Sequence, residues 1–253
     1  MKGFIVAFSI YSKIPMPQSE WKDEDMKYSL CFFPFVGVVI AALMVGWHAL
    51  AMELSVGYIF RLCVMAAIPI LVTGGFHVDG YMDYMDAMHS YKSKEDKLKI
   101  LSDPHIGAFS VIMLVLYYIL FIGTVSEVND HKKVLLLGGG FVLSRIFSAF
   151  MVIHLKPAKE SGMFRYFSDT ASKNKVTGIL VAEFIILTSL MSIFVSAYFL
   201  FEVLAVLLFS IYYRYKCYKE LGGVTGDTAG MFVARGELIG LLVLAVCFFV
   251  VRL

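Results

Sequence analysis

Long apolar segments alternate with short polar ones along almost the whole chain, and this pattern constrains the fold most. A helix needs about 20 apolar residues to cross a bilayer, where no water is available to satisfy free backbone groups. The chain is 59% hydrophobic and only 17% charged, unlike a soluble domain of 253 residues. The sequence therefore predicts an all-α, polytopic integral membrane bundle with about seven transmembrane helices. The expected spans are 30–52, 58–73, 109–126, 134–154, 178–198, 199–214 and 237–252.

The first eleven residues form an apolar stretch that is too short to cross the membrane. Pro15 and Pro17 end any helix there, and no small-residue cleavage site follows, so a signal peptide is not indicated. We expect a short re-entrant or interfacial helix instead. Because no internal repeat or linker interrupts the chain, residues 1–253 are predicted to form a single membrane domain.

The basic residues lie mostly on one side of the predicted spans. The N-terminus and the loops at 74–108, 155–177 and 214–236 hold 17 of the 22 Lys and Arg residues. Short basic loops stay in the cytoplasm. We therefore expect a multi-pass protein of the cell (cytoplasmic, or inner) membrane, with its N-terminus and active face in the cytoplasm.

An acidic motif at residues 74–86 follows the second apolar segment directly. Asp79, Asp83 and Asp86 are spaced i, i+4, i+7, so on a helix they share one face. Three carboxylates so close repel one another unless a cation lies among them. Oxygen ligands of this kind suit Mg²⁺, which keeps positions for water and substrate phosphates. A solvated helical turn is the alternative, and His77 is either a phosphate or metal contact or a structural residue.

Two further candidates lie near helix ends. Asp103 precedes the third span, where it is either the N-cap or part of a phosphate site at a helix N-terminus. Lys159, in a basic loop, either binds an anion or anchors the loop at lipid headgroups.

Arg145 lies deep inside a predicted span, where an unpaired charge is costly. It either pairs with a structural acid or grips a phosphate through its planar guanidinium, and we favour the phosphate.

A glycine-rich turn at residues 222–227 is the last candidate, followed by Glu237 at the mouth of the final span. Its backbone can face a phosphate or nucleotide, although such turns between helices are common. Gly223, Thr225, Asp227 and Glu237 are the predicted substrate-binding residues of this region.

Together these motifs resemble the cobalamin synthase family of membrane enzymes, the adenosylcobinamide-GDP ribazoletransferases. The resemblance runs nearly from end to end. It is carried by residues 14–17, 33–37, 74–86, 103–109, 144–145 and 222–227. The Gly-Gly-x-His-x-Asp-Gly-x-x-Asp-x-x-Asp and Gly-Gly-Val-Thr-Gly-Asp strings are specific in combination.

The resemblance implies a Mg²⁺-dependent transfer late in cobalamin biosynthesis. Adenosylcobinamide-GDP and α-ribazole, or α-ribazole 5′-phosphate, would give adenosylcobalamin, or its 5′-phosphate, and GMP. Asp83 or Asp86 would be the general base that takes the proton of the attacking hydroxyl. The expected partners are these substrates and the lipid bilayer, with no nucleic acid, and either a second copy or other cobalamin-assembly enzymes.

Two rival functions remain open at this point. CDP-alcohol phosphotransferases also carry Asp-rich motifs on membrane helices, but their longer motif is absent because Asp86 is followed by Ala87-Met88-His89. A cation-coupled transporter would favour acids near the bilayer midplane and an internal repeat.

Overall fold

The structure, a computed structural model, describes residues 2–17, 21–160 and 162–251. Helices account for nearly all of this part of the chain, which contains no β-strand, as predicted. The α-helices are α1 (Lys2–Tyr11), α2 (Asp23–Met26), α3 (Phe33–Glu53), α4 (Tyr58–Thr73), α5 (Phe76–His89), α6 (Lys94–Ile100), α7 (Ala108–Val125), α8 (His131–His154), α9 (Met163–Thr170), α10 (Lys173–Leu190), α11 (Phe199–Leu221) and α12 (Gly226–Val251), with a 3₁₀-helix, η1 (Ser29–Phe32), and a π-helix, η2 (Met191–Val195).

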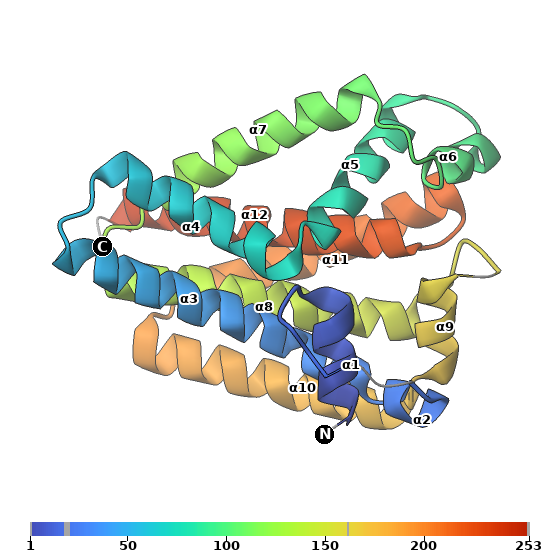
Figure 1. The fold of residues 1–253 in the computed structure, drawn as a ribbon, viewed down its shortest axis with the longest axis horizontal. Helices are drawn as coiled ribbons and strands as arrows, with labels where there is room; N and C mark the ends of the chain where they lie inside the picture. Colours follow the sequence, from blue (N-terminus) through green and yellow to red (C-terminus); the bar gives the residue numbers. More distant parts are fainter. Residues whose placement is uncertain (1, 18–20, 161, 252–253) are drawn as a thin grey trace.

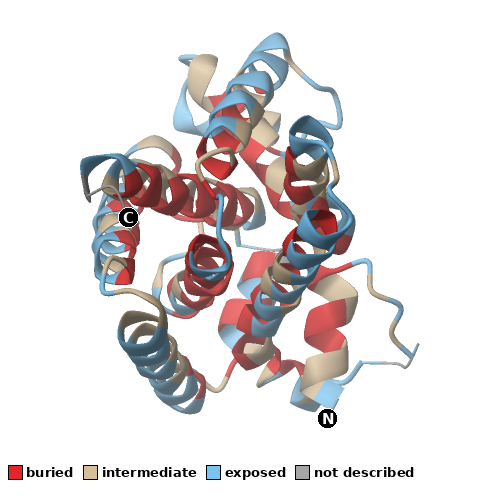
Figure 2. Ribbon diagram, turned by 90° about the vertical axis from the view of Figure 1, so that its left-hand side faces the viewer, coloured by how far each residue is buried: buried red, intermediate tan, exposed pale blue. Residues whose placement is uncertain are grey.

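Helix α8 is the centre of the bundle. It packs against α3, α10, α11 and α12 (Figure 1). Buried residues gather where helices face one another, and exposed residues cover the outer faces (Figure 2). Many of the exposed residues are large and apolar, including Ile112 on α7, Ile186 on α10 and Phe249 on α12. Apolar outer faces are expected where helices contact lipid.

The number of membrane-spanning helices differs from the prediction. In the described residues, five helices are long and apolar enough to cross a bilayer, or six if α4 and α5, which are bent by 92°, together form one span. The predicted count of seven is therefore not confirmed. Helix α11 is not among the five, because Glu202, Arg214 and Lys216 all fall within 18 of its residues.

The final helix also begins earlier than predicted. Helix α12 starts at Gly226 rather than near residue 237, so only residues 222–225 separate it from α11. Arg235 therefore lies inside a helix rather than in a loop. Glu237 lies inside the same helix rather than at the mouth of a span. The charged residues Asp227, Arg235 and Glu237 interrupt the apolar run here and hid this start from a search for apolar residues.

Small residues bring the central helices close together. A Cβ added to Gly37 of α3 would lie 2.5 Å from the carbonyl oxygen of Phe141 on α8. A Cβ added to the glycines of α8 would also be crowded. Gly138 faces Ala41 of α3, Gly139 faces Phe199 of α11, and Gly140 faces Glu202 of α11. Such close approach of backbones is typical of helices that pack within a membrane.

Replacing Gly37 with Ala is expected to destabilise the bundle by about 1–3 kcal/mol, because the added methyl group meets backbone atoms of α8 that cannot move freely. Gly46→Ala is the matched control, since a Cβ at Gly46 of the same helix has nothing within 4 Å. Thermal unfolding in detergent would compare the two. Equal melting temperatures for the two variants would contradict the close contact between α3 and α8 at Gly37.

Candidate active site between α5, α8, α9 and α12

A break between α4 and α5 directs the acidic helix toward the site. Gly74 and Gly75 have φ values of 66° and 80°, in the left-handed region that glycine adopts most easily. The end of α4 is held by a hydrogen bond of 2.8 Å from the N–H of Lys13 to the carbonyl of Val72. Helix α5 therefore leaves at 92° to α4 and runs toward the start of α12.

Gly80 allows α5 to approach the backbone of α12. A Cβ at this position would lie 2.6 Å from the carbonyl oxygen of Asp227. The close contact brings Asp79 and Asp227 to the same cavity, although they are far apart in the sequence. The motif glycine thus has a packing role that positions two carboxylates.

The N-terminus of α12 is fixed by two threonines. The hydroxyl of Thr225 accepts a hydrogen bond of 3.2 Å from the N–H of Thr228, and the hydroxyl of Thr228 accepts one of 2.9 Å from the N–H of Thr225. Thr225 also donates to the Asp227 carboxylate over 3.3 Å. These bonds cap the helix and orient Asp227.

Gly223 joins this turn to the basic loop. The N–H of Val224 donates to the carbonyl of Lys156 at 3.0 Å, and the N–H of Ala158 donates to the carbonyl of Val224 at 2.8 Å. A Cβ on Gly223 would lie 2.5 Å from the Lys156 oxygen. The described lining of the cavity includes Val224 but not Gly223. The structure shows close backbone packing at Gly223, and its phosphate-binding role stays a prediction.

The paired loops bring Lys159 to the rim of the cavity. Its ammonium group donates a hydrogen bond of 2.6 Å to the hydroxyl of Ser102, and the side chain lines the cavity together with Asp227. The positive charge therefore faces the space shared by Asp79 and Asp227. This position suits an anion ligand.

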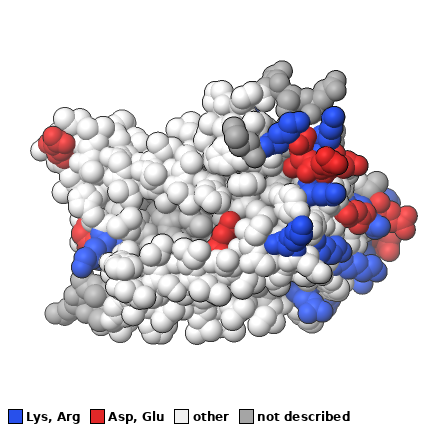
Figure 3. Space-filling view, turned by 90° about the horizontal axis from the view of Figure 1, so that it is seen from below, with Lys and Arg blue, Asp and Glu red and all other residues white. Residues whose placement is uncertain are grey.

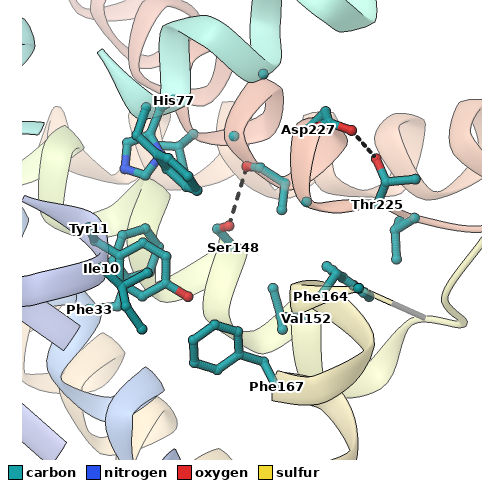
Figure 4. Close-up of a pocket in the computed structure, with 18 of the residues that line it drawn as sticks. Ile10, Tyr11, Phe33, His77, Ser148, Val152, Phe164, Phe167, Thr225 and Asp227 are labelled. Carbon is teal, nitrogen blue, oxygen red and sulfur yellow. Dashed lines mark hydrogen bonds between the residues drawn. The ribbon is translucent and has the colours of Figure 1, made fainter. Parts of the chain in front are cut away.

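The cavity has a volume of about 310 Å³, the lower end of the range for small-molecule sites. Asp227 and Thr225 lie on one side of it, and Tyr11, Phe33 and Phe167 on the other (Figure 4). The sequence predicted His77, Lys159, Thr225 and Asp227 as binding residues and Asp79 as a metal ligand, and the structure brings all five to this cavity.

His77 lies at the cavity with both ring nitrogens buried and without a hydrogen-bond partner among the described residues. Its side chain is surrounded by the rings of Phe33 and Phe76, each 5.5 Å away between centroids. Buried polar groups normally have partners. The imidazole of His77 is therefore available to a molecule bound in the cavity.

The predicted triad of aspartates does not converge on one point. Asp86 accepts hydrogen bonds from the N–H groups of Gly107 at 2.5 Å and Ser110 at 3.0 Å, so both of its oxygens face the start of α7. Among the described residues, no three His, Cys, Asp or Glu side chains are grouped closely enough to hold a metal. In the structure Asp86 stabilises a helix N-terminus, and its roles as metal ligand and general base stay predictions.

Asp83 lies one turn beyond Asp79 on the same face of α5. It is close enough to Asp79, Asp86 and Asp227 for their negative charges to act on it. Asp79 and Asp227 line the cavity, and Asp83 lies near both of them without being among the described lining residues.

Arg145 and Glu237 form a buried ion pair behind His77 and Phe33 and are not among the described lining residues of the cavity. The guanidinium donates to the Glu237 carboxylate and to the carbonyl of Phe141, both at 2.6 Å. The two side chains are 1% and 7% exposed. The ion pair is the structural alternative that the sequence left open for Arg145, and the phosphate-binding roles of Arg145 and Glu237 stay predictions.

Asp103 is exposed and does not cap α7, whose N-cap is Gly107. Its carboxylate accepts hydrogen bonds from the backbone N–H and the ring of His105, which hold the pKa of Asp103 below its ordinary value. Asp103 is not part of the described cavity lining, so its predicted role in phosphate binding is not supported.

Several residues that line the cavity could not be found from the sequence. Tyr11 of α1, Ser148 of α8, and Arg165 and Phe167 of α9 come from segments that carry no motif. Arg165 also pairs with Asp169 at 2.6 Å. Of these residues, only Arg165 was suggested by the sequence, through the basic character of the 155–177 loop.

The fold and the site define a multi-pass helical membrane protein with a carboxylate-lined cavity at one end of its bundle. A model of the family described as cobalamin-5-phosphate synthase matches residues 3–245. The chain belongs to this family, and it is a transferase of cobalamin synthesis.

Named relatives agree with this assignment. A protein of Lachnoclostridium phytofermentans is 41% identical over 234 residues, 92% of this chain and 89% of the relative. One of Clostridium perfringens is 31% identical, covering 97% of this chain and 98% of its own length. Both are named adenosylcobinamide-GDP ribazoletransferase. No solved structure matches the chain.

Proposed function

We propose that the chain joins adenosylcobinamide-GDP to α-ribazole, or to its 5′-phosphate, in a Mg²⁺-dependent reaction that releases GMP. The names of the relatives supply the substrates. The observation that carries the proposal is one cavity that combines Asp79, Asp227 and Lys159 with the unpartnered imidazole of His77. Acidic, basic and hydrogen-bonding groups in one enclosed site suit phosphoryl transfer.

The residues at the cavity fit Mg²⁺. This ion is commonly held by one or two carboxylates, with water and substrate phosphates as its other ligands. Asp79 and Asp227 both line the cavity and can supply the carboxylates. When bound, Mg²⁺ neutralises negative charge on the diphosphate and on the departing GMP.

The remaining residues have separate tasks in the transfer. A ribose hydroxyl of the ribazole forms a bond to the phosphorus attached to cobinamide, and the bond from that phosphorus to the bridging oxygen breaks as GMP leaves. The hydroxyl proton goes to a carboxylate. Asp83 fits this role better than Asp86, because both oxygens of Asp86 already accept hydrogen bonds. Lys159 and His77 bind and orient phosphate oxygens.

We also propose how the protein is oriented in the membrane. Charged side chains gather at one end of the bundle, and few appear at the other end in Figure 3. The cavity lies at the charged end, since Lys159 and Arg165 line it. We place this end, with the N-terminus, in the cytoplasm of the cell, because short basic loops are retained there. Association with a second copy or with other cobalamin-assembly enzymes stays a prediction.

The test is GMP release by the purified protein in nanodiscs. Adenosylcobinamide-GDP and α-ribazole are supplied with Mg²⁺ or with a chelator, and cobalamin formation is followed in the same samples. We expect GMP and cobalamin in equal amounts, only with the metal. No release by folded protein would contradict the proposed substrates, and release in the chelator would contradict the metal requirement.

A further inference from the structure

The cavity has two chemically different ends. Asp79, Thr225, Asp227 and Lys159 make one end polar. At the other end the ring of Tyr11 lies 4.2 Å from that of Phe33 and 6.0 Å from that of Phe167, measured between centroids (Figure 4). A bound molecule must therefore have a charged or hydroxylated part and a flat apolar part.

Three segments far apart in the sequence build the aromatic end. Tyr11 comes from the end of α1, Phe33 from the start of α3, and Phe164 and Phe167 from α9. Phe164 and Phe167 are buried, whereas Arg165 and Asp169 of the same helix pair with each other at the surface. Helix α9 thus turns Phe164 and Phe167 to the cavity, and Arg165 lines it as well.

Few polar groups accompany these rings. Beside the hydroxyl of Tyr11 these are His77, whose ring lies 5.5 Å from that of Phe33 between centroids, and Ser148, whereas Ile10, Leu30 and Val152 are apolar. A guanine base carries several donors and acceptors on its edge, and burying them without partners is costly. A benzimidazole has a flat aromatic face and far fewer polar atoms, so it fits this wall better.

We propose that the aromatic end binds the heterocyclic base of the ribazole substrate, stacked against Phe167 and Tyr11. The ribose then extends toward Asp79 and Asp227, where its hydroxyl meets the phosphorus to be attacked. The cavity is of nucleoside size, so the much larger corrinoid stays outside and only its diphosphate arm reaches in. This inference rests on the proposed function and assigns one substrate to one end of its site.

Direct binding tests the assignment without turnover. α-Ribazole alone, and GMP alone, are titrated by calorimetry into the wild-type protein, Phe167→Leu, Tyr11→Phe and Phe209→Leu in nanodiscs. Phe209 is the matched control, because it is buried and stacks on Phe232, away from the described cavity lining. We expect Phe167→Leu to weaken α-ribazole binding about tenfold, the order lost when a base no longer stacks on an aromatic ring.

The controls separate the base from other effects. Tyr11→Phe keeps the ring and is expected to weaken α-ribazole binding less than Phe167→Leu does, whereas Phe209→Leu is expected to bind α-ribazole like the wild type. GMP affinity is expected to be the same in Phe167→Leu and the wild type. Melting temperatures verify folding, and Phe164→Leu replaces Phe167→Leu if the latter does not fold.

Two results would overturn the assignment. One is unchanged α-ribazole affinity in folded Phe167→Leu, and the other is a loss confined to GMP, which would give the aromatic end to guanine. Either result is compatible with intact GMP release by the wild-type enzyme. A failure of the inference is thereby distinguishable from a failure of the proposed function, which shows itself as no GMP release at all.

Discussion

Asp79→Asn is expected to lower Mg²⁺-dependent GMP release by on the order of 10²–10³-fold, the loss typical when one preorganised charge is removed from an active site. Asparagine has nearly the same shape, so α5 should keep its contact with α12. The neutral amide is a poorer ligand for Mg²⁺ than a carboxylate. Initial rates at several Mg²⁺ concentrations measure the effect, and the variant should need more metal to reach half of its maximal rate.

Asp96→Asn is the control for this experiment. Asp96 lies on α6, is exposed, and pairs with Lys99 at 2.8 Å outside the described cavity lining. Its loss should leave GMP release unchanged. If folded Asp79→Asn retained the wild-type rate and metal dependence, Asp79 would not be a metal ligand, and the site would have to be built around Asp83 and Asp227 alone.

The sequence predicted the parts of the fold that follow from local patterns. Apolar segments at 58–73 and 134–154 correspond closely to α4 and α8, because a continuous apolar run leaves the backbone no alternative inside lipid. The acidic motif directly follows the first of these segments, and α5 accordingly follows α4. The start of α12 was missed because charged residues, Arg235 and Glu237, divide its apolar residues into two runs.

The site was predictable in its residue types but not in its grouping. Asp79, Asp83 and Asp86 share a helix face, yet the neighbouring helices decide their partners: α12 approaches Asp79 at Gly80, and α7 engages Asp86. The aromatic end could not be predicted from the sequence, because residues of three separate helices, α1, α3 and α9, build it. A motif within one helix can be read from spacing, whereas contacts between distant helices depend on packing.

The second large effect is expected at the ion pair inside the bundle. Arg145→Met should destabilise the protein by about 3–5 kcal/mol, because it leaves the buried Glu237 carboxylate without its partner. The melting temperature in detergent measures this loss. Lys99→Met is the control, since Lys99 is 77% exposed in its pair with Asp96 and its replacement should leave the melting temperature unchanged.

The double variant Arg145→Met, Glu237→Met distinguishes a structural pair from a phosphate ligand. Replacing both members of a buried pair by apolar residues of similar size is often neutral for stability, so the double variant should melt near the wild-type temperature. It should also keep most of its GMP release, because the pair lies outside the described cavity lining. If the double variant were stable but inactive, Arg145 would contact the substrate. The result would then support the phosphate-binding role that the sequence predicted.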